Sequence, residues 1–445
     1  MKMKKAAAFV LAMSLCGALF GCQSSQQAAP SQAAASTAAA SSQAASQASK
    51  PAEITVVTSY GGDDGNRANY EAAVKDYETA TGNTVKDASG TSNEEWKAKI
   101  MADFETGAEP DVLFYFNGVD SNKIVQGGKV VSIDEIRKVY PEYAGNMKDE
   151  LLGASPADGK NYSVPVNGYW EALYVNKKVL SAAGVQAPDA STTWDQFLKD
   201  CEAVKSKGCT PIACSLQEVP HYWFEYTIFN HDTVAAHAKL PASSTDGEGK
   251  AWVAGLGDIK TLYEKGYFPK NTLTATDAET FQLMADNKAA FAIDGSWKLG
   301  WFTQNAKDIN DFTVTYVPAQ NQRKATDIIG GISMGYYITK KAWDDPAKQK
   351  ACVQFVEAMT TDQVVSKFGA TAVTALKNGT TAPNGADSLT LAAIAMAKGQ
   401  TGIAAAAQDN LGQQARTALF ADIKNIVSGK KDAAKAVDTA LTTKG

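Results

Sequence analysis

Strand-like and helix-like segments alternate along the chain from residue 54, and this alternation constrains the fold more than any other feature of the sequence. The apolar run ITVV predicts a buried strand, and Tyr70, Val74 and Tyr77 then mark one face of a helix. A weaker strand, a second helix and a clear strand at 111–116 follow. Strands that alternate with helices predict parallel sheets covered on both faces. We therefore expect an α/β fold with parallel-rich sheets flanked by helices.

Polar side chains follow two of these expected strands, at the point where each strand ends. Ligands of parallel sheets bind beyond the carboxyl ends of the strands, so these two loops are candidate contact regions. The first loop, GGDDG, carries two carboxylates and no lysine, which disfavours phosphate and suits a neutral, hydroxylated ligand. The candidate residues are Tyr60, Asp63, Asp64, Phe116, Asn117 and Asp120.

A turn rich in unlike groups follows another expected strand, in the stretch FAIDGSW at 291–297. Asp294, Gly295 and Trp297 place an acid, a flexible residue and an indole within four positions. A core strand needs no such groups at its end. The indole of Trp297 either packs under the turn or is presented to a flat ligand.

The first residues have the pattern of an export signal. Three lysines precede the uncharged and mostly apolar residues 6–20, a run too short for a membrane-spanning helix of about 20 residues. The sequence LFGC at 19–22 resembles the lipobox of bacterial lipoproteins, in which the cysteine is acylated and becomes the first residue. We expect residues 1–21 to be a lipoprotein signal peptide and Cys22 to carry lipid. The alternative is an ordinary signal peptide with an incidental cysteine.

Residues 23–50 contain no aromatic side chain and no aliphatic one larger than alanine. Such a segment buries too little apolar surface to offset its ordering entropy, so we expect a disordered tether from the lipidated Cys22 to residue 50. Loss of the three leader lysines changes the formal net charge from -5 to -8. An acidic body without a basic stripe argues against nucleic acid as a partner.

The part of the chain beyond the tether is longer than a domain with a single hydrophobic core usually is, which predicts two domains. Its cysteines are weakly informative. Cys201 lies four residues after Phe197 on an expected helix face and reads as a small core residue, although a disulfide with Cys209 or Cys214 remains open in an exported protein.

Four stretches resemble the extracellular solute-binding proteins, family 1, the sugar-binding components of ABC importers. They are VPVNGYWEALYVNKK, TTWDQFLKDCEAVKSKGCTPIACSLQEVPHYW, KAAFAIDGSW and GGISMGYYITKKAWDDPAKQKACVQFVEAM. Their order and spacing are typical of that family, and the resemblance covers the chain from about residue 53 to its end.

The resemblance implies a two-lobe fold of the periplasmic-binding-protein type (type 2), in which chain crossings form a hinge and the ligand is clamped between the lobes. The first lobe is expected to hold residues 51–168 plus 316–334. The second is expected to hold residues 169–315 plus 335–445.

The resemblance also implies contacts from the second lobe and from the crossings. The tryptophan of the DGSW turn, which stacks on a sugar ring in relatives, matches Trp297. The further expected ligand-binding residues are Trp170, Glu171, Gln217, Glu218, His221, Tyr222, Trp223, Asp294, Gly295 and Gly331. Sugars present C–H bonds on one face and hydroxyls at the edge, so aromatic rings beside carboxylates suit them. For Trp170, Tyr222 and Trp223, a place in the core is the competing interpretation.

The sequence supports an enzyme less well than a binding protein. Residues 331–335 match G-x-S-x-G, but the hydrolase elbow needs a helix after Ser333, whereas YYITK predicts a strand. The three histidines lack metal-site spacing. Glu218 and Asp294 could form the acid pair of a glycosidase, whose carboxylate separation the sequence does not give. We expect no enzyme activity, no cofactor and no metal.

The expected function is therefore that of a receptor on the extracellular face of the bacterial cell membrane. It would be held there by lipid on Cys22, bind a mono- or oligosaccharide as a monomer, and deliver it to the permease subunits and cytoplasmic ATPase of an ABC importer. A polyamine receptor of the same fold is the alternative, because the acids Asp63 and Asp64 could also neutralise ammonium groups. Iron or peptide binding and a carbohydrate-active enzyme rank lower.

Overall fold

The computed structural model describes residues 51–443, except Asp63, Asn167, Val219, residues 370–372 and Pro383. The expected signal peptide, the lipidated Cys22, the tether and the candidate contact Asp63 lie outside the described residues.

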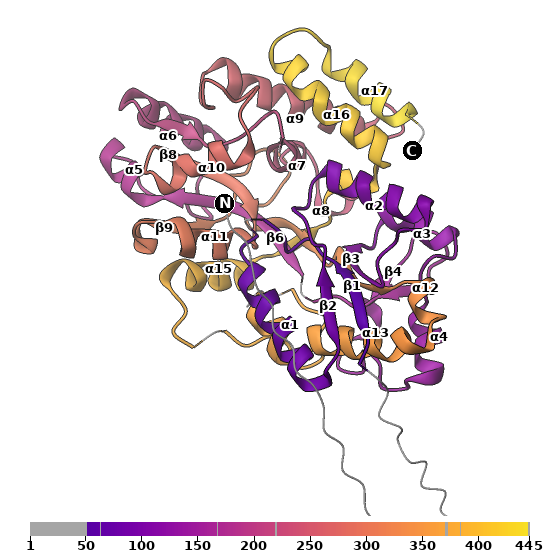
Figure 1. Ribbon diagram of the computed structural model, residues 1–445. Coiled ribbons are helices and arrows are strands. Elements are labelled where there is room, and N and C mark those ends of the chain that lie inside the picture. The colour runs from indigo at the N-terminus through magenta and orange to yellow at the C-terminus, as the bar shows by residue number, and fades with distance from the viewer. Residues whose placement is uncertain are drawn as a thin grey trace, which may run out of the picture. The chain divides into compact units, whose positions relative to one another are not determined.

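The first sheet contains four strands in the order β11-β3-β1-β2, and its strands β1, β2 and β3 lie side by side in Figure 1. β1 (Glu53–Val57) pairs in parallel with β2 (Thr84–Asp87) and β3 (Val112–Phe116), and β11 (Met334–Ile338) pairs antiparallel with β3. Side chains of α1 (Arg67–Thr81) and α13 (Pro346–Met359) join the core on one face. Those of α2 (Glu94–Thr106) and α3 (Asn122–Gln126) join the core on the other. We call this sheet and its two cores lobe 1.

The second sheet has the order β12-β10-β6-β8-β7, with β9 paired to β6. Its strands are β6 (Tyr169–Asn176), β7 (Thr210–Ile212), β8 (Ala289–Gly295), β9 (Phe312–Thr315), β10 (Asp327–Gly331) and β12 (Gly402–Ala404). One core includes side chains of α6 (Trp194–Ser206), α7 (His221–Phe229), α9 (Gly247–Glu264), α16 (Gln413–Val427) and α17 (Ala433–Thr442). The other includes α10 (Asp277–Ala285), α11 (Lys298–Asn305) and α15 (Ser388–Gly399). We call this sheet and its two cores lobe 2.

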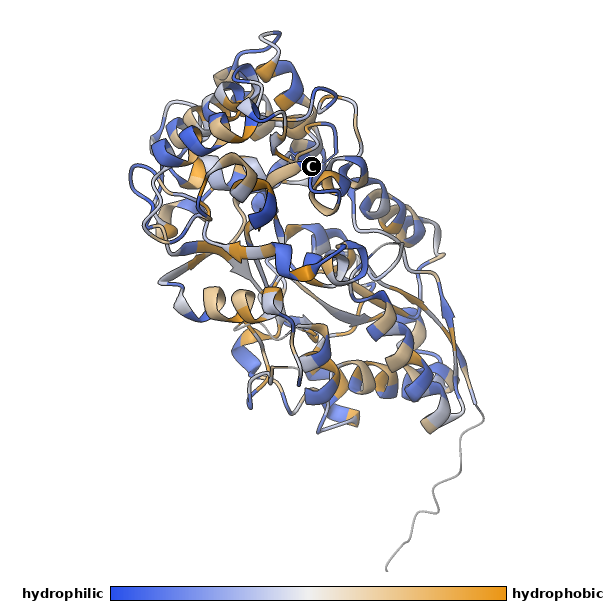
Figure 2. Cartoon of the chain, turned by 90° about the vertical axis from the view of Figure 1, so that its left-hand side faces the viewer, coloured by the Kyte–Doolittle hydropathy of each residue, from blue (hydrophilic) through white to orange (hydrophobic). Residues whose placement is uncertain are grey.

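Short elements complete the described chain. The 3-10 turns are η1 (Val119–Ser121), η2 (Asp149–Leu151), η3 (Ile309–Asp311) and η4 (Ala407–Asn410), and β4 (Gly153–Ala154) pairs with β5 (Asn161–Ser163). The short helices are α4 (Ile133–Val139), α5 (Lys177–Ala183), α8 (Val234–His237), α12 (Lys340–Trp343) and α14 (Asp362–Phe368). Most helices carry polar and apolar stripes, which is the pattern of one buried and one solvated face (Figure 2).

The expected α/β class is confirmed, but the expectation of parallel-rich sheets holds only for lobe 1. In lobe 2, the long central strand β6 is antiparallel to β8, β9 and β10. The pairs β7 with β8 and β10 with β12 are parallel. Because β6 lies at the centre of the sheet and runs antiparallel to all three strands that pair with it, the sheet of lobe 2 is mixed rather than parallel-rich.

The expected division of the returning segments is wrong for residues 316–331 and 335–376. Strand β10 pairs with β6 of lobe 2, and Tyr316 and Val317 join lobe 2 cores. Strand β11 pairs with β3, and side chains from Ala351 to Leu376 join a lobe 1 core. Residues beyond about 387 return to lobe 2 as expected. Strand pairing decides the matter, because a paired strand cannot leave its sheet without losing its ladder of hydrogen bonds.

The stretch GGISMGYYITK predicts one strand from its sequence, but the structure has two strands in two sheets here. β10 ends at Gly331, whose φ of +154° lies in a region that favours glycine, and β11 starts at Met334. A Cβ on Gly330 would lie 2.7 Å from the carbonyl oxygen of Tyr169, so this position also requires glycine. Gly330 and Gly331 therefore lie at a chain crossing, where the backbone at Gly330 closely approaches that of Tyr169.

Helix starts agree in part with the sequence. The spacing of Thr193 and Gln196 predicts a helix cap, and Thr193 does cap α6, its hydroxyl accepting from the amide of Gln196. The spacing of Ser92 and Glu95 predicts a capping box, but this prediction is wrong, because Asn93 is the N-cap of α2 and its side chain accepts from the amide of Trp96. Among the described cysteines, Cys201, Cys209, Cys214 and Cys352 are free thiols. Within the described residues, no helix is both long and apolar enough to cross a membrane.

Candidate functional site

Trp297 lies in the turn that joins β8 to α11, and its half-buried indole folds back over Gly295. A Cβ on Gly295 would lie 2.1 Å from the indole ring, so only glycine leaves room for this arrangement. The rings of Tyr169 and Tyr222 each lie with their centroids 6.1 Å from that of Trp297. We call these three side chains the aromatic cluster.

Asp294 directly precedes Gly295 on β8 and is almost fully buried. Its carboxylate accepts from the amide of Gly295 at 2.7 Å, and the ammonium of Lys298 lies 3.5 Å away. Burial raises the pKa of Asp294, and the positive charge of Lys298 opposes that rise. Lys298 also contacts Asp277 at 3.1 Å and lies over the ring of Phe281. The turn thus presents an indole and a buried acid that already has a cationic partner.

The first loop of lobe 1 meets this turn directly. A Cβ on Gly65 would lie 2.5 Å from the carbonyl oxygen of Trp297, and a Cβ on Gly300 would lie 2.4 Å from that of Gly65. Burial raises the pKa of Asp64 to about 6, with Lys298 acting in the opposite direction. Asp64 therefore lies within electrostatic reach of the lobe 2 turn.

Glu171 is the acid of β6 on the same side of the strand as Tyr169, because side chains alternate along a strand. Its side chain is 2 % exposed, and Oε2 has no hydrogen-bond partner among the described residues. Burial raises the pKa of Glu171 well above its ordinary value, and the charges of Glu225, Asp409 and Asp294 raise it further. Glu171 is thus a buried acid among other acids.

Helix α7 brings His221 and Tyr222 to the edge of the cluster. The His221 ring lies 4.1 Å from that of Tyr222 and 5.5 Å from that of Phe420, centroid to centroid. Burial lowers the pKa of His221 to about 3, and the positive charges of Lys97 and Arg416 lower it further, so the imidazole is neutral at pH 7. His221 can therefore offer a neutral donor or acceptor to a polar ligand.

Ion pairs between the lobes lie beside His221. Arg416 of α16 is 1 % exposed, and its guanidinium lies 2.9 Å from Asp120 and 3.1 Å from Glu94. Lys97 lies 3.1 Å from Asp120 and 3.2 Å from Glu94. We call Glu94, Lys97, Asp120 and Arg416 the interlobe ion network. Nearby cations lower the pKa of Asp120, Lys97 before Arg416, against the effect of burial.

Several predicted contacts do not face the cluster. Trp170 and Trp223 are fully buried in lobe 2 cores, so the core interpretation is correct for both. Gln217 and Glu218 are exposed: Gln217 accepts from the ammonium of Lys424, and Glu218 accepts from the amide of Asp277. These two residues follow β7 at the sheet edge rather than its centre, which explains why their side chains turn outward.

Of the lobe 1 candidates, Tyr60 is buried and stacks on Phe114, so it belongs to the core. Asp120 is occupied by the interlobe ion network. Phe116 packs under the ammonium of Lys97, which lies 4.1 Å above its ring. These three residues support the wall of the site without offering a free polar group to it.

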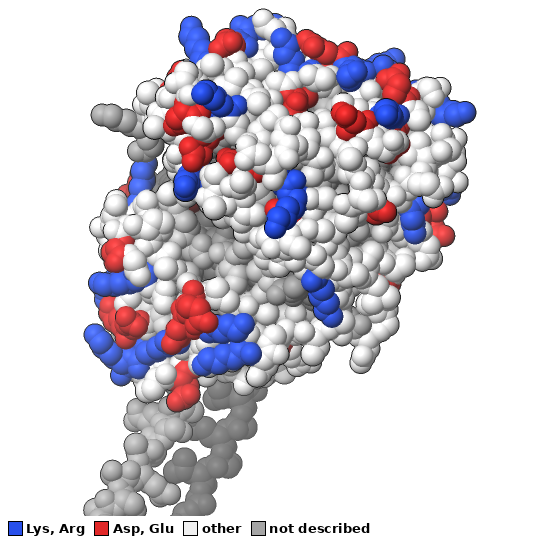
Figure 3. Space-filling view, turned by 180° about the vertical axis from the view of Figure 1, so that it is seen from behind, with Lys and Arg blue, Asp and Glu red and all other residues white. Residues whose placement is uncertain are grey.

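A cavity of about 460 Å³ holds two further candidates, Asn117 and Gly331. Residues of both lobes line it, including Lys148 and Glu150 of lobe 1 and Ile403 of lobe 2. A Cβ on Gly331 would lie 4.0 Å from the ring of Tyr169, but Tyr169, Tyr222 and Trp297 are not among the residues that line this cavity. On the face opposite to that of Figure 1, charged side chains gather toward the top and the lower left, and the hollowed band between them is mostly uncharged (Figure 3).

Sequence reasoning missed Tyr169, Lys298, Asp409 and Arg416. The period of two along a strand could have found Tyr169, because Glu171 was already a candidate and lies two positions further. Arg416 carries no local signal, since its partners Glu94 and Asp120 lie about 300 residues earlier in the chain. Ser333 is followed by strand β11 and not by a helix, so the G-x-S-x-G match lacks the elbow geometry.

The profile of the family described as bacterial extracellular solute-binding proteins matches residues 72–374, which is more than half of the chain. Among curated proteins, the chain is 22% identical over 299 residues to a multiple sugar-binding protein of Streptococcus mutans, covering 61% of this chain and 69% of that protein. It is 26% identical over 215 residues to a melibiose/raffinose/stachyose-binding protein of Bacillus subtilis, covering 45% of this chain and 47% of that one.

Solved structures share the fold. A chitin oligosaccharide binding protein superimposes with a TM-score of 0.75 at 23% identity, over 88% of this chain and 97% of that chain. The maltose/maltodextrin-binding domain of Bdellovibrio bacteriovorus, bound to maltotriose, gives a TM-score of 0.67 at 17% identity, over 87% and 97%. The two-lobe α/β architecture is therefore that of solute receptors. On the extent of the profile match and of the shared fold, this chain belongs to the bacterial extracellular solute-binding proteins.

Proposed function

We propose that this protein captures a carbohydrate between its two lobes and delivers it to an ABC importer. The observation that carries the proposal is the aromatic cluster, which lies beside the buried carboxylates of Asp294 and Glu171 and against the lobe 1 loop at Gly65. A sugar ring stacks its C–H face on an aromatic ring and hydrogen-bonds through its edge. Carboxylates accept those hydrogen bonds without needing a proton of their own.

The relatives support this class of ligand. The names of two of the curated relatives specify sugars, and two of the shared folds belong to proteins named for, or bound to, oligosaccharides. Members of the family bind solutes, and we propose that this protein likewise binds its ligand without catalysing a reaction. The working partners are then the carbohydrate, the permease subunits of an importer and its ATPase, with the receptor acting as a monomer.

We place the protein at the extracellular face of the bacterial membrane, held by lipid on Cys22. The support is the lipobox-like LFGC and the length of tether that follows it. In a bacterial host, Cys22→Ala is expected to abolish the acyl mass and to move the protein from the membrane fraction to the soluble one. Mass spectrometry of the mature N-terminus checks this. Wild-type protein without acyl groups would show the anchor to be wrong.

The experiment that tests the proposed function is a thermal-shift panel of mono- and oligosaccharides with spermidine and putrescine. A ligand that binds only the folded state raises the melting temperature by mass action, with about 2.7 kcal/mol of stabilisation at 100 times its Kd. We expect at least one sugar to raise the melting temperature in a concentration-dependent way. A response to polyamines alone would instead favour the polyamine receptor.

A further inference from the structure

Glu171 differs from the other buried acids around the aromatic cluster, because it lacks a counter-charge. Asp294 has the ammonium of Lys298 and the amide of Gly295. Glu225 accepts from the amides of residues 407 and 408 and contacts the ring of His237 at 2.8 Å. Glu171 makes no such contact through Oε2 among the described residues.

The nearby cations are already engaged elsewhere. Lys298 contacts Asp277 as well as Asp294, and Lys97 and Arg416 are held by Glu94 and Asp120. The positive charges of Lys97 and Arg416 act on Asp409, whereas the charged groups that act on Glu171 among the described residues are the carboxylates of Glu225, Asp409 and Asp294. The ion pairs of the site thus leave one buried carboxyl group unmatched.

The surroundings of Glu171 match a cation on a ligand. Tyr169, two residues away on the same side of β6, brings its ring against Trp297, and Tyr222 completes the cluster. The faces of tyrosine and tryptophan attract an ammonium group within about 6 Å, and more strongly where water is excluded. An unmatched carboxylate beside three aromatic rings is the arrangement that recognises an amine.

We propose that the solute carries a protonated primary amine, which binds at the carboxylate of Glu171 against the aromatic cluster. This inference rests on the proposed function, because an amino sugar meets both requirements: the ring stacks on the indole and the ammonium pairs with the acid. A neutral sugar hydroxyl can hydrogen-bond to Glu171 but supplies no positive charge beside Glu225, Asp409 and Asp294. A buried carboxylate is stable only with a partner of opposite charge, which an ammonium supplies when the carboxyl releases its proton.

Three related probes test the inference by titration calorimetry: the β-1,4-linked glucosamine trimer, its fully N-acetylated form, and cellotriose. They share a backbone and differ in the amine. We expect wild-type protein to bind the glucosamine trimer at least tenfold more tightly than either neutral trimer. Spermidine and putrescine form the second arm, since a polyamine would supply the same ammonium without a sugar ring.

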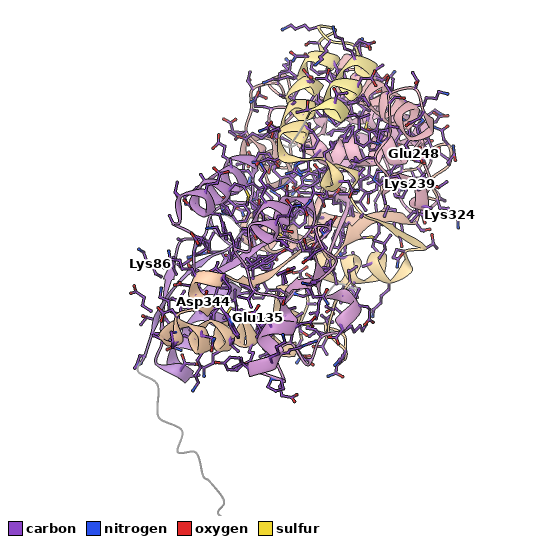
Figure 4. All side chains as sticks on the ribbon, turned by 90° about the vertical axis from the view of Figure 1, so that its right-hand side faces the viewer. Lys86, Glu135, Lys239, Glu248, Lys324 and Asp344 are labelled. Atoms are coloured by element: carbon purple, nitrogen blue, oxygen red, sulfur yellow. The ribbon has the colours of Figure 1, made fainter. Side chains whose placement is uncertain are left out.

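Glu171→Gln keeps the shape of the side chain and removes its charge. The ratio of affinities between the glucosamine trimer and its N-acetylated form is expected to fall from at least tenfold to about one. The matched control is Glu135→Gln, the same chemical change on the outer surface of lobe 1, where Figure 4 shows Glu135 near Asp344 and away from lobe 2. This control is expected to keep the wild-type ratio.

Proton release gives an independent readout on wild-type protein. The pKa of Glu171 is raised in the ligand-free state, so a bound ammonium lowers it and releases a proton between the ordinary glutamate pKa and the raised value. Titrations in buffers of different ionisation enthalpy should show this release with the glucosamine trimer and less of it with the neutral trimers. Glu225, Asp409 and Asp294 are the other charged groups that act on Glu171 among the described residues, and they are common to all three titrations.

The outcomes separate the two proposals. If a neutral trimer binds wild type as tightly as the glucosamine trimer, the amine inference is wrong while carbohydrate binding stands. If the polyamines bind and no trimer does, the amine is retained and the carbohydrate function fails. An unchanged affinity ratio in Glu171→Gln would remove Glu171 from the amine site, and binding of none of the probes would count against both proposals.

Discussion

Trp297→Ala is expected to weaken sugar binding at least tenfold while leaving the melting temperature close to that of wild type. The half-buried indole contacts the rings of Tyr169 and Tyr222 and covers Gly295, but it is not part of a lobe core. Its loss removes about 1.5 to 3 kcal/mol of apolar contact with a stacked sugar, and 1.4 kcal/mol corresponds to tenfold in affinity. Titration calorimetry together with thermal melts measures both quantities.

Trp223→Ala is the matched control, because it removes the same side chain from a core. Trp223 is 1% exposed and packs against Phe197 and Phe268. The expected cost is about 3 to 5 kcal/mol of folding free energy, and any loss of binding should follow unfolding. A Trp297→Ala protein that melts normally and binds sugar like wild type would falsify the stacking role.

Arg416→Met is expected to destabilise the protein by about 3 to 5 kcal/mol and to open the ligand-free form. The substitution keeps the apolar stem but leaves Asp120 and Glu94 without the guanidinium that joins them across the lobes. Removing one partner of a buried ion pair has this order of cost. In this variant the buried Asp120 keeps only Lys97 as a cationic partner, whereas Glu94 is partly exposed. Small-angle scattering should show a larger radius of gyration without ligand, and saturating ligand should reduce it.

The control for this variant is Lys260→Met, which removes a cation from an exposed pair within lobe 2. The ammonium of Lys260 lies 3.8 Å from Glu264, and both side chains are exposed. Exposed pairs contribute about 0 to 1 kcal/mol, so stability and scattering should stay near wild type. Identical scattering curves for Arg416→Met and Lys260→Met would contradict a role of the interlobe ion network in closure.

Local sequence patterns predicted helices and strands correctly where residues close together in the chain determine them. The buried run at β1, the helix face of Tyr70 and Tyr77, and the cap at Thr193 lie where expected. They depend on spacing within about one or two turns of chain, which the sequence contains in full. The cap at Asn93 was missed because Ser92 offered an equally good local pattern one residue earlier.

Placement of the returning segments was not predictable in this way. Strands β10 and β11 are separated by two residues and lie in different sheets, so their apolar pattern is the same whichever sheet receives them. Pairing partners such as Glu171 for Ile329 and Phe116 for Met334 are distant in the sequence. The two glycines at 330 and 331 were the only local sign of a crossing.

The site was predicted best where the motif itself forms the geometry. Asp294, Gly295 and Trp297 act within one turn, and their sequence spacing is their spatial relation. Trp223 and Tyr222 are neighbours on α7, yet one lies in the core and the other at the cluster, because successive helix positions point about 100° apart. The interlobe ion network depends on contacts between lobes and has no signature in either segment alone.

Calorimetric titration of the wild-type protein with the sugars that raise its melting temperature decides whether the protein is a carbohydrate receptor. We expect saturable binding of at least one sugar, with one site per chain, and loss of that heat in Trp297→Ala but not in Glu135→Gln. Absence of binding by every sugar, with saturable binding of spermidine or putrescine under the same conditions, would contradict the carbohydrate-receptor function.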